Sequence, residues 1–405
     1  MDVRITPAKL SGSVRIPGSK SAAHRAIIAA SLAKGTSLLT NVTMSKDIEA
    51  TMGAMTALGA QFTVESDTVR VTGSGGKAAG KCTIDCNESG STLRFIIPIA
   101  AALGAEAEFL GKGRLPERPI DIYKRELSRH GISFTSSEMP YRISGRLTGG
   151  TYEIEGNVSS QFITGLLFAL PLIQEDSTIR MTSHLESRPY VDMTIQTLRR
   201  AGITVHETED SFTIPGGQSY SPCDIQVEGD YSQAAFFCTA NALGCRISVE
   251  GLDPDSVQGD KRILQIVESM SSGSFNEDCS DIPDLVPIMA VLAAFGRDRS
   301  VIYNAQRLRI KESDRLAAVS DMLGRLGGDV TVTEDGLIIC PTGKMTGGQV
   351  DSFGDHRIVM AAAIAAVGCS GDVVIRGAQA VEKSYPDFFK DYIHLGGKVN
   401  VIDME

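Results

Sequence analysis

Lysine, arginine, serine and glycine gather in several short stretches of this sequence, in combinations that suit an anionic ligand. The stretch Arg307–Arg315 (RLRIKESDR) holds four cations together with the carboxylates Glu312 and Asp314. A carboxylate among cations suits either a charge-balanced surface turn or a proton-handling group beside an anionic substrate. Taken alone, the stretch leaves both interpretations open.

A second stretch, Pro17–Ser21 (PGSKS), has the parts of a phosphate cradle. Gly18 allows close backbone approach, the serines offer hydroxyls, Lys20 supplies charge, and Arg25 follows about one helical turn after Ser21. A Ser-capped helix with a solvated lysine would explain the same residues. The GxxxxGK[ST] spacing of a Walker A loop is absent, which argues against a nucleotide-binding kinase.

Comparable loops precede most of the expected helices. Arg357 would stand at the entrance of a buried, Ala-rich helix, where it needs a counter-charge from Asp355 or from an anion. Asp284, at another helix start, is more often a cap than a catalyst. Because helix N-termini favour anions, such loops together predict a multiply anionic small-molecule substrate. The further loops are Asn87–Arg94, Gly111–Pro119, Asn157–Gln161, Glu228–Ser232, Asp281–Asp284, Gly354–Arg357 and Glu382–Asp387.

The composition narrows the class of protein. A net charge of −10 and a pI near 5.2 argue against nucleic acid or an anionic membrane surface as a partner. Eight cysteines occur without a CxxC pair, and Cys82 with Cys86 is a weak metal signal, so a reducing compartment is expected. No apolar run approaches the roughly 20 residues that cross a bilayer. We therefore expect a soluble, cytoplasmic protein.

The elements that must position these residues recur along the chain. At 405 residues the chain predicts two domains. A helix, a glycine turn and a strand-like hairpin recur about every 70 residues, which indicates six mixed α/β units, three in each domain. The turn glycines are Gly59, Gly131, Gly202, Gly273, Gly327 and Gly396, the copy at Gly273 being the weakest. An N-terminal strand, Val3–Ile16, could pair with either half, and a polar seam lies at Ser219–Asp224.

With these motifs in order, the sequence resembles the 5-enolpyruvylshikimate-3-phosphate synthase family of enolpyruvyl transferases. The resemblance runs from Pro17–Ser21 through Lys311–Leu316 (KESDRL) and Asp355–Arg357 (DHR) to Lys383–Asp387 (KSYPD). It implies transfer of the enolpyruvyl group of phosphoenolpyruvate to the 5-hydroxyl of shikimate 3-phosphate, with release of phosphate. No metal or organic cofactor, nucleic acid or membrane is expected, and the protein should be a monomer.

The resemblance also implies a fold, the two-domain inverted α/β barrel, with three βαβαββ-like repeats in each domain. Residues 1–18 plus 229–405 would form one domain and residues 19–228 the other. Closure of the two domains over the substrates is expected.

Carried over by position, the resemblance implies two sets of binding residues. Shikimate 3-phosphate would be held by Lys20, Ser21, Arg25, Ser159, Ser160, Gln161, Ser187, Asp284 and Lys311. Phosphoenolpyruvate would be held by Lys20, Gly90, Arg118, Gln161, Arg315, Arg357 and Lys383. The catalytic candidates are Lys20, Asp284, Lys311 and Glu312. Glu312 would transfer the proton at C3 of phosphoenolpyruvate, and Asp284 or Lys311 would take the hydroxyl proton.

Two departures from the family pattern stand out. Arg307 replaces an Asn that contacts shikimate 3-phosphate, and Phe95 replaces a Pro after Arg94, which leaves glyphosate sensitivity open. The runner-up activity is enolpyruvyl transfer to UDP-N-acetylglucosamine, but those enzymes use a reactive Cys, and Gly113–Arg118 contains none. A non-catalytic anion-binding protein would not need Glu312 and Asp284.

Overall fold

The computed structural model describes residues 1–77 and 80–402 and divides the chain into two compact units. Gly18–Glu228 forms one, here called the N-terminal unit. Met1–Pro17 and the chain from Gly229 onward form the other, called the C-terminal unit. The division differs from the expected boundaries only at Gly18, which falls in the N-terminal unit. Among the described helices, none has the length and apolar character that crossing a bilayer would require.

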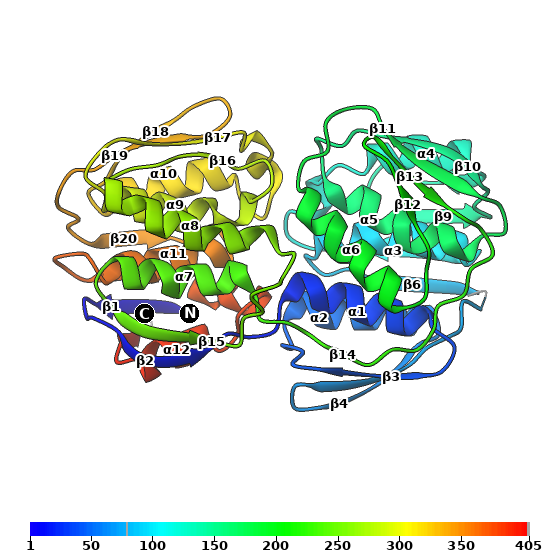
Figure 1. Ribbon diagram of the computed structural model, residues 1–405, viewed down its shortest axis with the longest axis horizontal. Coiled ribbons are helices and arrows are strands. Elements are labelled where there is room, and N and C mark those ends of the chain that lie inside the picture. Colours follow the sequence, from blue (N-terminus) through cyan, green and yellow to red (C-terminus); the bar gives the residue numbers. More distant parts are fainter. Residues whose placement is uncertain (78–79, 403–405) are drawn as a thin grey trace. The chain divides into compact units, whose positions relative to one another are not determined.

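The N-terminal unit contains three βαβαββ repeats, and the four strands of each repeat form one sheet (Figure 1). The first strand pair of each sheet is parallel and the remaining pairs are antiparallel. One repeat comprises β6 (Lys81–Asp85), α3 (Gly90–Ala102), β7 (Glu106–Leu110), α4 (Asp121–Arg129), β8 (Ile132–Phe134) and β9 (Tyr141–Gly145). The next comprises β10 (Gly150–Ile154), α5 (Ser160–Ala169), β11 (Ser177–Met181), α6 (Arg188–Arg200), β12 (His206–Glu207) and β13 (Ser211–Ile214). The third comprises β14 (Ile225–Gln226), α1 (Lys20–Leu32), β3 (Thr36–Thr40), α2 (Lys46–Ala57), β4 (Gln61–Glu65) and β5 (Thr68–Thr72).

The C-terminal unit has two full repeats and one shortened repeat. The first full repeat comprises β16 (Asn276–Asp278), α9 (Val286–Ala294), β17 (Ser300–Tyr303), α10 (Arg315–Arg325), β18 (Asp329–Val332) and β19 (Leu337–Cys340). The second comprises β20 (Gly348–Asp351), α11 (His356–Ala366), β21 (Val373–Arg376), α12 (Phe388–His394), β22 (Lys398–Ile402) and β1 (Asp2–Thr6). The shortened repeat comprises β2 (Ser11–Arg15), α7 (Tyr231–Ala242), β15 (Arg246–Glu250) and α8 (Ile263–Ser269).

The beginning of the chain departs from the sequence prediction. A single strand over Val3–Ile16 is wrong, because β1 and β2 are separate strands in different sheets. β1 lies between β21 and β22, with both pairings antiparallel, and β2 pairs in parallel with β15. Both strands therefore complete sheets of the C-terminal unit.

Six glycines end the outer helices as the repeat predicts, because all six have a positive φ. The values are 99° at Gly59, 87° at Gly131, 79° at Gly202, 107° at Gly273, 90° at Gly327 and 92° at Gly396. The left-handed conformation reverses the chain after the helix at little cost for a residue without Cβ. The copy at Gly273 lacks the predicted hairpin, since the strand that follows, β16, pairs in parallel with β17 of the next repeat.

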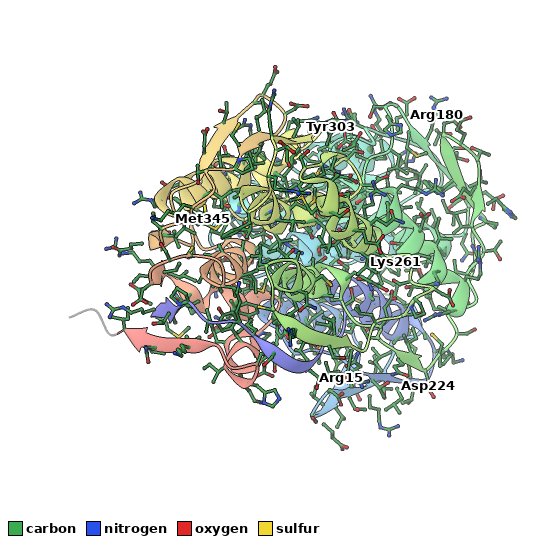
Figure 2. The ribbon with its side chains drawn as sticks, turned by 60° about the vertical axis from the view of Figure 1, so that its left-hand side comes forward. Arg15, Arg180, Asp224, Lys261, Tyr303 and Met345 are labelled. Atoms are coloured by element: carbon green, nitrogen blue, oxygen red, sulfur yellow. The ribbon has the colours of Figure 1, made fainter. Side chains whose placement is uncertain are left out.

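In each unit three helices lie inside and the sheets lie outside, as in the inverted α/β barrel. The inner helices are α1, α3 and α5 in one unit and α7, α9 and α11 in the other (Figure 1). All nine residues of α9 are buried and apolar, as befits a helix covered on every side. The outer faces of the sheets are polar, as Arg180 of β11 illustrates by pointing outward to pair with Glu153 of β10 (Figure 2).

Inner helices of the two units begin with different capping residues. Ser19, Ser89 and Ser159 cap α1, α3 and α5 by accepting a hydrogen bond from a backbone N–H of the first turn. Asp230 and Asp355 cap α7 and α11 in the same way. A neutral cap leaves the positive end of a helix available to an external anion, whereas a carboxylate already offsets it. The N-terminal unit thus presents three helix starts without an acidic cap.

Candidate active site

Arg315 is the centre of a buried charge cluster in the C-terminal unit. It is the first residue of α10 and is only 1% exposed. Its nitrogens donate to three carboxylates, at 2.9 Å to Asp355, 3.0 Å to Asp284 and 2.6 Å to Glu312. Burial alone would lower the pKa of this guanidinium, but the three carboxylates outweigh burial and raise it. Arg315 is therefore a permanent cation that holds three acidic groups in place.

Asp284 joins Arg315 to a second buried arginine. It lies in the short 3₁₀ turn Pro283–Leu285 before α9, and its second carboxylate oxygen accepts from Arg357 at 2.7 Å. Its side chain does not cap α9, so the structure does not favour the capping interpretation. Although burial opposes ionisation, Arg357, Lys311 and Arg315 hold the pKa of Asp284 well below its ordinary value. Asp284 is thus a firmly ionised carboxylate with both oxygens engaged.

Lys311 and Glu312 come from the loop between the 3₁₀ turn Gln306–Ile310 and α10. Burial lowers the pKa of Lys311 to about 8, because the opposing attraction of Asp284 is the weaker effect. Glu312 is held by Arg315 through the contact described above. An amine that titrates near neutrality and a fixed carboxylate are therefore consecutive in the chain.

Arg357 and Lys383 complete the cationic side of the cluster. Arg357 donates to the backbone oxygen of Asp284 at 3.2 Å as well as to its carboxylate. Asp355 accepts from the backbone N–H of Arg357 at 2.9 Å as the cap of α11, and the counter-charge of the guanidinium comes from Asp284 rather than, as the sequence had suggested, from Asp355. Lys383 donates to the carbonyl of Gly354 at 3.1 Å, at the start of α11. Four predicted site residues of this unit, Asp284, Glu312, Arg315 and Arg357, are thus linked with Asp355 in one network, and Lys383 contacts Gly354 beside it.

Arg307 is part of the structural support of the neighbouring loop. It is 8% exposed and donates to the backbone oxygen of Ser280, in the turn that leads to Asp284. Arg309, by contrast, pairs with Asp314 at 3.3 Å near the surface. Within the nine-residue stretch, the charges divide between a buried network and a surface pair, so the charge-balanced surface turn describes only Arg309 and Asp314.

The N-terminal unit holds the second group of predicted residues. Lys20, the first residue of α1, donates to Asp47 in the first turn of α2 at 2.7 Å. Ser19 caps α1, as the alternative interpretation of this loop expected, but the solvated lysine of that interpretation is wrong, because Lys20 is largely buried in its ion pair with Asp47. Asp47 had no signal of its own in the sequence, since an acidic residue in a first helical turn is common.

Arg25 is a buried cation held by neutral acceptors. Its nitrogens donate to the backbone oxygens of Ser21 at 2.7 Å and Tyr190 at 2.8 Å, and to the hydroxyl of Thr194 at 2.8 Å. Burial lowers its pKa to about 10. Because no carboxylate pairs with it among the described residues, Arg25 retains an uncompensated positive charge beside the start of α1.

Gly90 and Arg118 lie against each other at the start of α3. A Cβ on Gly90 would come within 2.5 Å of a terminal nitrogen of Arg118, so a glycine allows this close approach. Arg94 is tied to Gln161 at 2.8 Å and to the backbone oxygen of Pro119 at 3.0 Å. These bonds connect the Gly90 turn with the loop that carries Arg118.

Gln161 joins the starts of two inner helices, α3 and α5. Its amide oxygen accepts from Arg94, and its amide nitrogen donates to Ser91 at 2.9 Å. Ser159 caps α5, as the plain interpretation of that loop expected, and Ser160 is the first helical residue. The sequence predicts no role for Arg94, because only the folded chain brings it to Gln161.

Ser187, at the start of α6, has an unusual backbone conformation. Its φ is 58° and ψ 38°, which is the left-handed region that serine seldom occupies. Such strain is kept where the surrounding structure fixes it, often at ligand sites. The side chain of Ser187 is 4% exposed.

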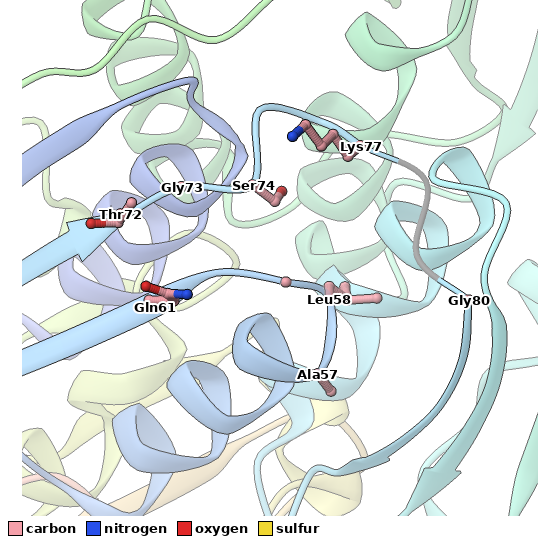
Figure 3. Close-up of a pocket in the computed structure, with 9 residues that line it drawn as sticks. Ala57, Leu58, Gln61, Thr72, Gly73, Ser74, Lys77 and Gly80 are labelled. Atoms are coloured by element: carbon pink, nitrogen blue, oxygen red, sulfur yellow. The ribbon is translucent and has the colours of Figure 1, made fainter.

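A hollow of about 380 Å³ lies away from these residues, at the C-terminal end of α2 (Figure 3). A helix of 12 residues is about 18 Å long, which separates this end from Asp47 at the other. No predicted site residue lines the hollow, so we assign it no part in the chemistry. Its lining residues are Ala57, Leu58, Gly59, Gln61, Thr72, Gly73, Ser74, Lys77 and Gly80.

The fold agrees with the comparisons to known proteins. Solved structures similar to the chain include the EPSP synthase of Acinetobacter baumannii, with a TM-score of 0.82, 24% identity and coverage of 99% of this chain and 100% of that one. The enolpyruvyl transferase NikO from Streptomyces tendae gives a TM-score of 0.80 at 16% identity, covering 100% and 99%. At these identities the structures establish the shared fold.

Sequence similarity establishes the family. A protein of Clostridium novyi named 3-phosphoshikimate 1-carboxyvinyltransferase is 43% identical, with 98% of each chain covered. A protein of the same name from Clostridium perfringens is 44% identical over 98% of each chain. The sequence model of EPSP synthase (3-phosphoshikimate 1-carboxyvinyltransferase) matches residues 5–392. The chain belongs to the EPSP synthase family.

Proposed function

We propose that the chain transfers the enolpyruvyl group of phosphoenolpyruvate to the 5-hydroxyl of shikimate 3-phosphate and releases phosphate. Membership of the EPSP synthase family supports this activity. The observation that carries it furthest is the network of Asp284, Glu312, Arg315 and Arg357, with Lys311 beside it. It combines fixed cations for anionic groups with two groups able to handle protons.

The residues proposed to bind each substrate come from both units. The residues that bind shikimate 3-phosphate are Lys20, Ser21, Arg25, Ser159, Ser160, Gln161, Ser187, Asp284 and Lys311. The residues that bind phosphoenolpyruvate are Lys20, Gly90, Arg118, Gln161, Arg315, Arg357 and Lys383. The uncompensated charge of Arg25 supports its part in binding an anion. We further propose that the protein acts in the cytoplasm and that it is a monomer. Gel filtration can test the oligomeric state.

Lys311 accepts the proton of the 5-hydroxyl as that oxygen attacks C2 of phosphoenolpyruvate. A general base works best when its pKa is near the working pH, and the pKa of Lys311 is about 8. Asp284 is a poor base, because Arg315 and Arg357 hold both of its oxygens and keep its pKa low. Asp284 instead fixes the two arginines and orients the substrate hydroxyls.

Glu312 handles the proton at C3. In the addition step Glu312, in its protonated form, gives its proton to C3 while the new C2–O bond forms, giving the tetrahedral adduct and leaving Glu312 as a carboxylate that can take the proton back. In the elimination step that methyl carbon returns a proton, the C2–O bond to phosphate breaks, and the leaving phosphate carries the proton taken up by Lys311. Lys20, Arg315, Arg357 and Lys383 stabilise the charge on the phosphate and carboxylate as it shifts.

The test is phosphate release from phosphoenolpyruvate with either of two acceptors. We expect release with shikimate 3-phosphate and none with UDP-N-acetylglucosamine. The runner-up activity has little support, since Gly113–Arg118 holds no cysteine and burial raises the pKa of Cys86 and Cys279 beyond the range of a reactive thiolate. Release only with the sugar nucleotide, or with neither acceptor, would overturn the proposal.

A further inference from the structure

A buried chain of hydrogen bonds joins three helices of the N-terminal unit. His24 Nδ1 of α1 lies 2.7 Å from Thr51 Oγ1 of α2, which lies 2.7 Å from Thr92 Oγ1 of α3. Thr92 Oγ1 in turn donates to Ser89 Oγ, the cap of α3, at 2.8 Å. All four side chains are at most 1% exposed. Side-chain bonds across three helices hold their N-terminal halves in one register.

Donors and acceptors can be assigned along this series of hydrogen bonds in only one consistent way. Thr92 donates its single hydroxyl hydrogen to Ser89, so its oxygen must accept a hydrogen bond from Thr51. Thr51 then has no hydrogen left for His24, so His24 must donate through Nδ1. His24 is therefore the tautomer with hydrogen on Nδ1, and its Nε2 carries a lone pair.

The surroundings of His24 keep it neutral. Burial, with Lys20 and Arg25 on the same helix, lowers the pKa of His24 well below its ordinary value. Its Nε2 has no hydrogen-bond partner among the described residues, so a proton there would be buried and unsatisfied. The Phe95 ring packs edge-on against the imidazole, with the two ring centroids 6.3 Å apart, and the Arg25 guanidinium carbon lies 5.4 Å from the Phe95 centroid. The chain therefore starts from an imidazole that keeps one proton state.

Ser89, at the other end, is left as a hydrogen-bond donor. Its oxygen accepts from Thr92 Oγ1 and from the backbone N–H of Thr92 at 3.2 Å. No described residue accepts its own hydrogen, and because these two bonds occupy both lone pairs of the oxygen, that hydrogen is restricted to the one remaining direction. The next residue is Gly90, which lies against Arg118.

We propose that His24, Thr51 and Thr92 are positioning residues that aim the Ser89 hydroxyl at the phosphoenolpyruvate bound beside Gly90. The inference rests on the proposed function, because Gly90 and Arg118 are there the contacts of this substrate. It departs from a plain Ser cap, which needs an acceptor oxygen and no defined direction for its hydrogen. The chain acts on substrate affinity, since it sets a hydrogen bond made before the reaction.

The test compares Thr51→Val with Thr239→Val. Thr239 is fully buried in the C-terminal unit, and its hydroxyl has no partner among the described residues, so that variant controls for loss of a buried hydroxyl. We expect Thr51→Val to raise the KM for phosphoenolpyruvate roughly three- to tenfold, the effect of one ordinary hydrogen bond, with kcat nearly unchanged. Thr92→Val should act likewise and Thr92→Ser should restore the KM.

The imidazole ¹⁵N shifts give a readout that needs no substrate. Six histidines are present, and loss of one pair of signals in His24→Gln identifies those of His24. We expect a protonated Nδ1 and a bare Nε2 at neutral pH. A hydrogen on Nε2 overturns the inference, as does a wild-type KM in Thr51→Val while Gly90→Ala raises it. A wild-type KM in both variants instead overturns the proposed role of the Gly90 turn, and the inference with it.

Discussion

The pH dependence of catalysis tests the assignment of Lys311 as the base. A base must be deprotonated to act, so kcat/KM should rise as pH passes the pKa of the free enzyme. Burial places the pKa of Lys311 at about 8, inside the range that an assay can cover. If Lys311 acted only as a cation for an anionic substrate, kcat/KM would fall over the same range. The sign of the slope therefore separates the two roles.

The size of the effect follows from the pKa. One unit below it about a tenth of the amine is neutral and one unit above it about nine-tenths, so kcat/KM should rise about tenfold between pH 7 and pH 9. Phosphate groups complete their second ionisation near pH 6, so the substrates contribute little to this window. Bound substrate anions favour the charged amine, so the corresponding limb in kcat should lie at higher pH than that in kcat/KM.

The assay is phosphate release with shikimate 3-phosphate, measured from pH 7 to 9.5. Lys311→Arg keeps the positive charge but cannot deprotonate, so we expect at least about a hundredfold loss at every pH and no rising limb. The exposed Lys398, in the same unit, provides a matched control, and Lys398→Arg should keep the wild-type profile. A falling limb in the wild type, or a Lys311→Arg variant with ordinary activity, would refute the base.

Three further predictions concern individual side chains of the candidate site and one buried carboxyl of the C-terminal unit, Asp260. Glu312→Gln and Lys20→Ala should each lower kcat/KM at least about a hundredfold in the phosphate assay, and wild-type activity in either would refute its role. Gly90→Ala should displace Arg118 and raise the KM for phosphoenolpyruvate about tenfold, by weakening one charge-assisted bond, and an unchanged KM would count against that contact. Burial chiefly raises the pKa of Asp260 from 3.8 to about 7, so the folded state binds the extra proton and stability should fall as pH rises from about 4 to above 7. Asp260→Asn should remove that pH-dependent loss of unfolding free energy, which is at most about 4 kcal/mol in total. Urea titrations at several pH values measure it, and an unchanged pH dependence in the variant would place the proton on another group.

Repetition made much of the fold readable from the sequence. The spacing of the turn glycines was enough to predict the repeat, because each glycine performs the same left-handed reversal. The shortened repeat shows where this reasoning stops. Gly273 has the expected conformation, but β16 after it joins the next sheet, and strand pairing is a long-range choice that no local pattern encodes. The same holds for β1 and β2, whose partners lie far along the chain.

The sequence named the side chains proposed for the candidate site more successfully than it named their hydrogen-bond and ion-pair partners. The counter-charge for Arg357 was expected from Asp355, two positions away, but Asp355 accepts from the backbone N–H of Arg357 and the guanidinium pairs with Asp284. The bonds of Asp284 to Arg315 and Arg357 span 31 and 73 residues, so its role as their link appears only in the folded chain. Asp47 illustrates the same limit, since nothing near it in sequence singles it out as the partner of Lys20.

The capping residues suggest how a protein of net charge −10 can receive two anionic substrates. In the C-terminal unit Asp355 caps α11 and also takes up part of the charge of Arg315, so cations and carboxylates there hold one another in fixed geometry. In the N-terminal unit the caps of α1, α3 and α5 are serines, and Arg25 has only neutral acceptors. A fixed, nearly balanced network suits the proton-transfer groups, whose pKa values depend on every neighbouring charge. Uncompensated helix ends and an unpaired guanidinium suit capture of an anion, because no internal ion pair has to be broken first. On this argument the two units divide the work, one chiefly tuning proton transfer and the other chiefly attracting charge, whatever the net charge of the chain.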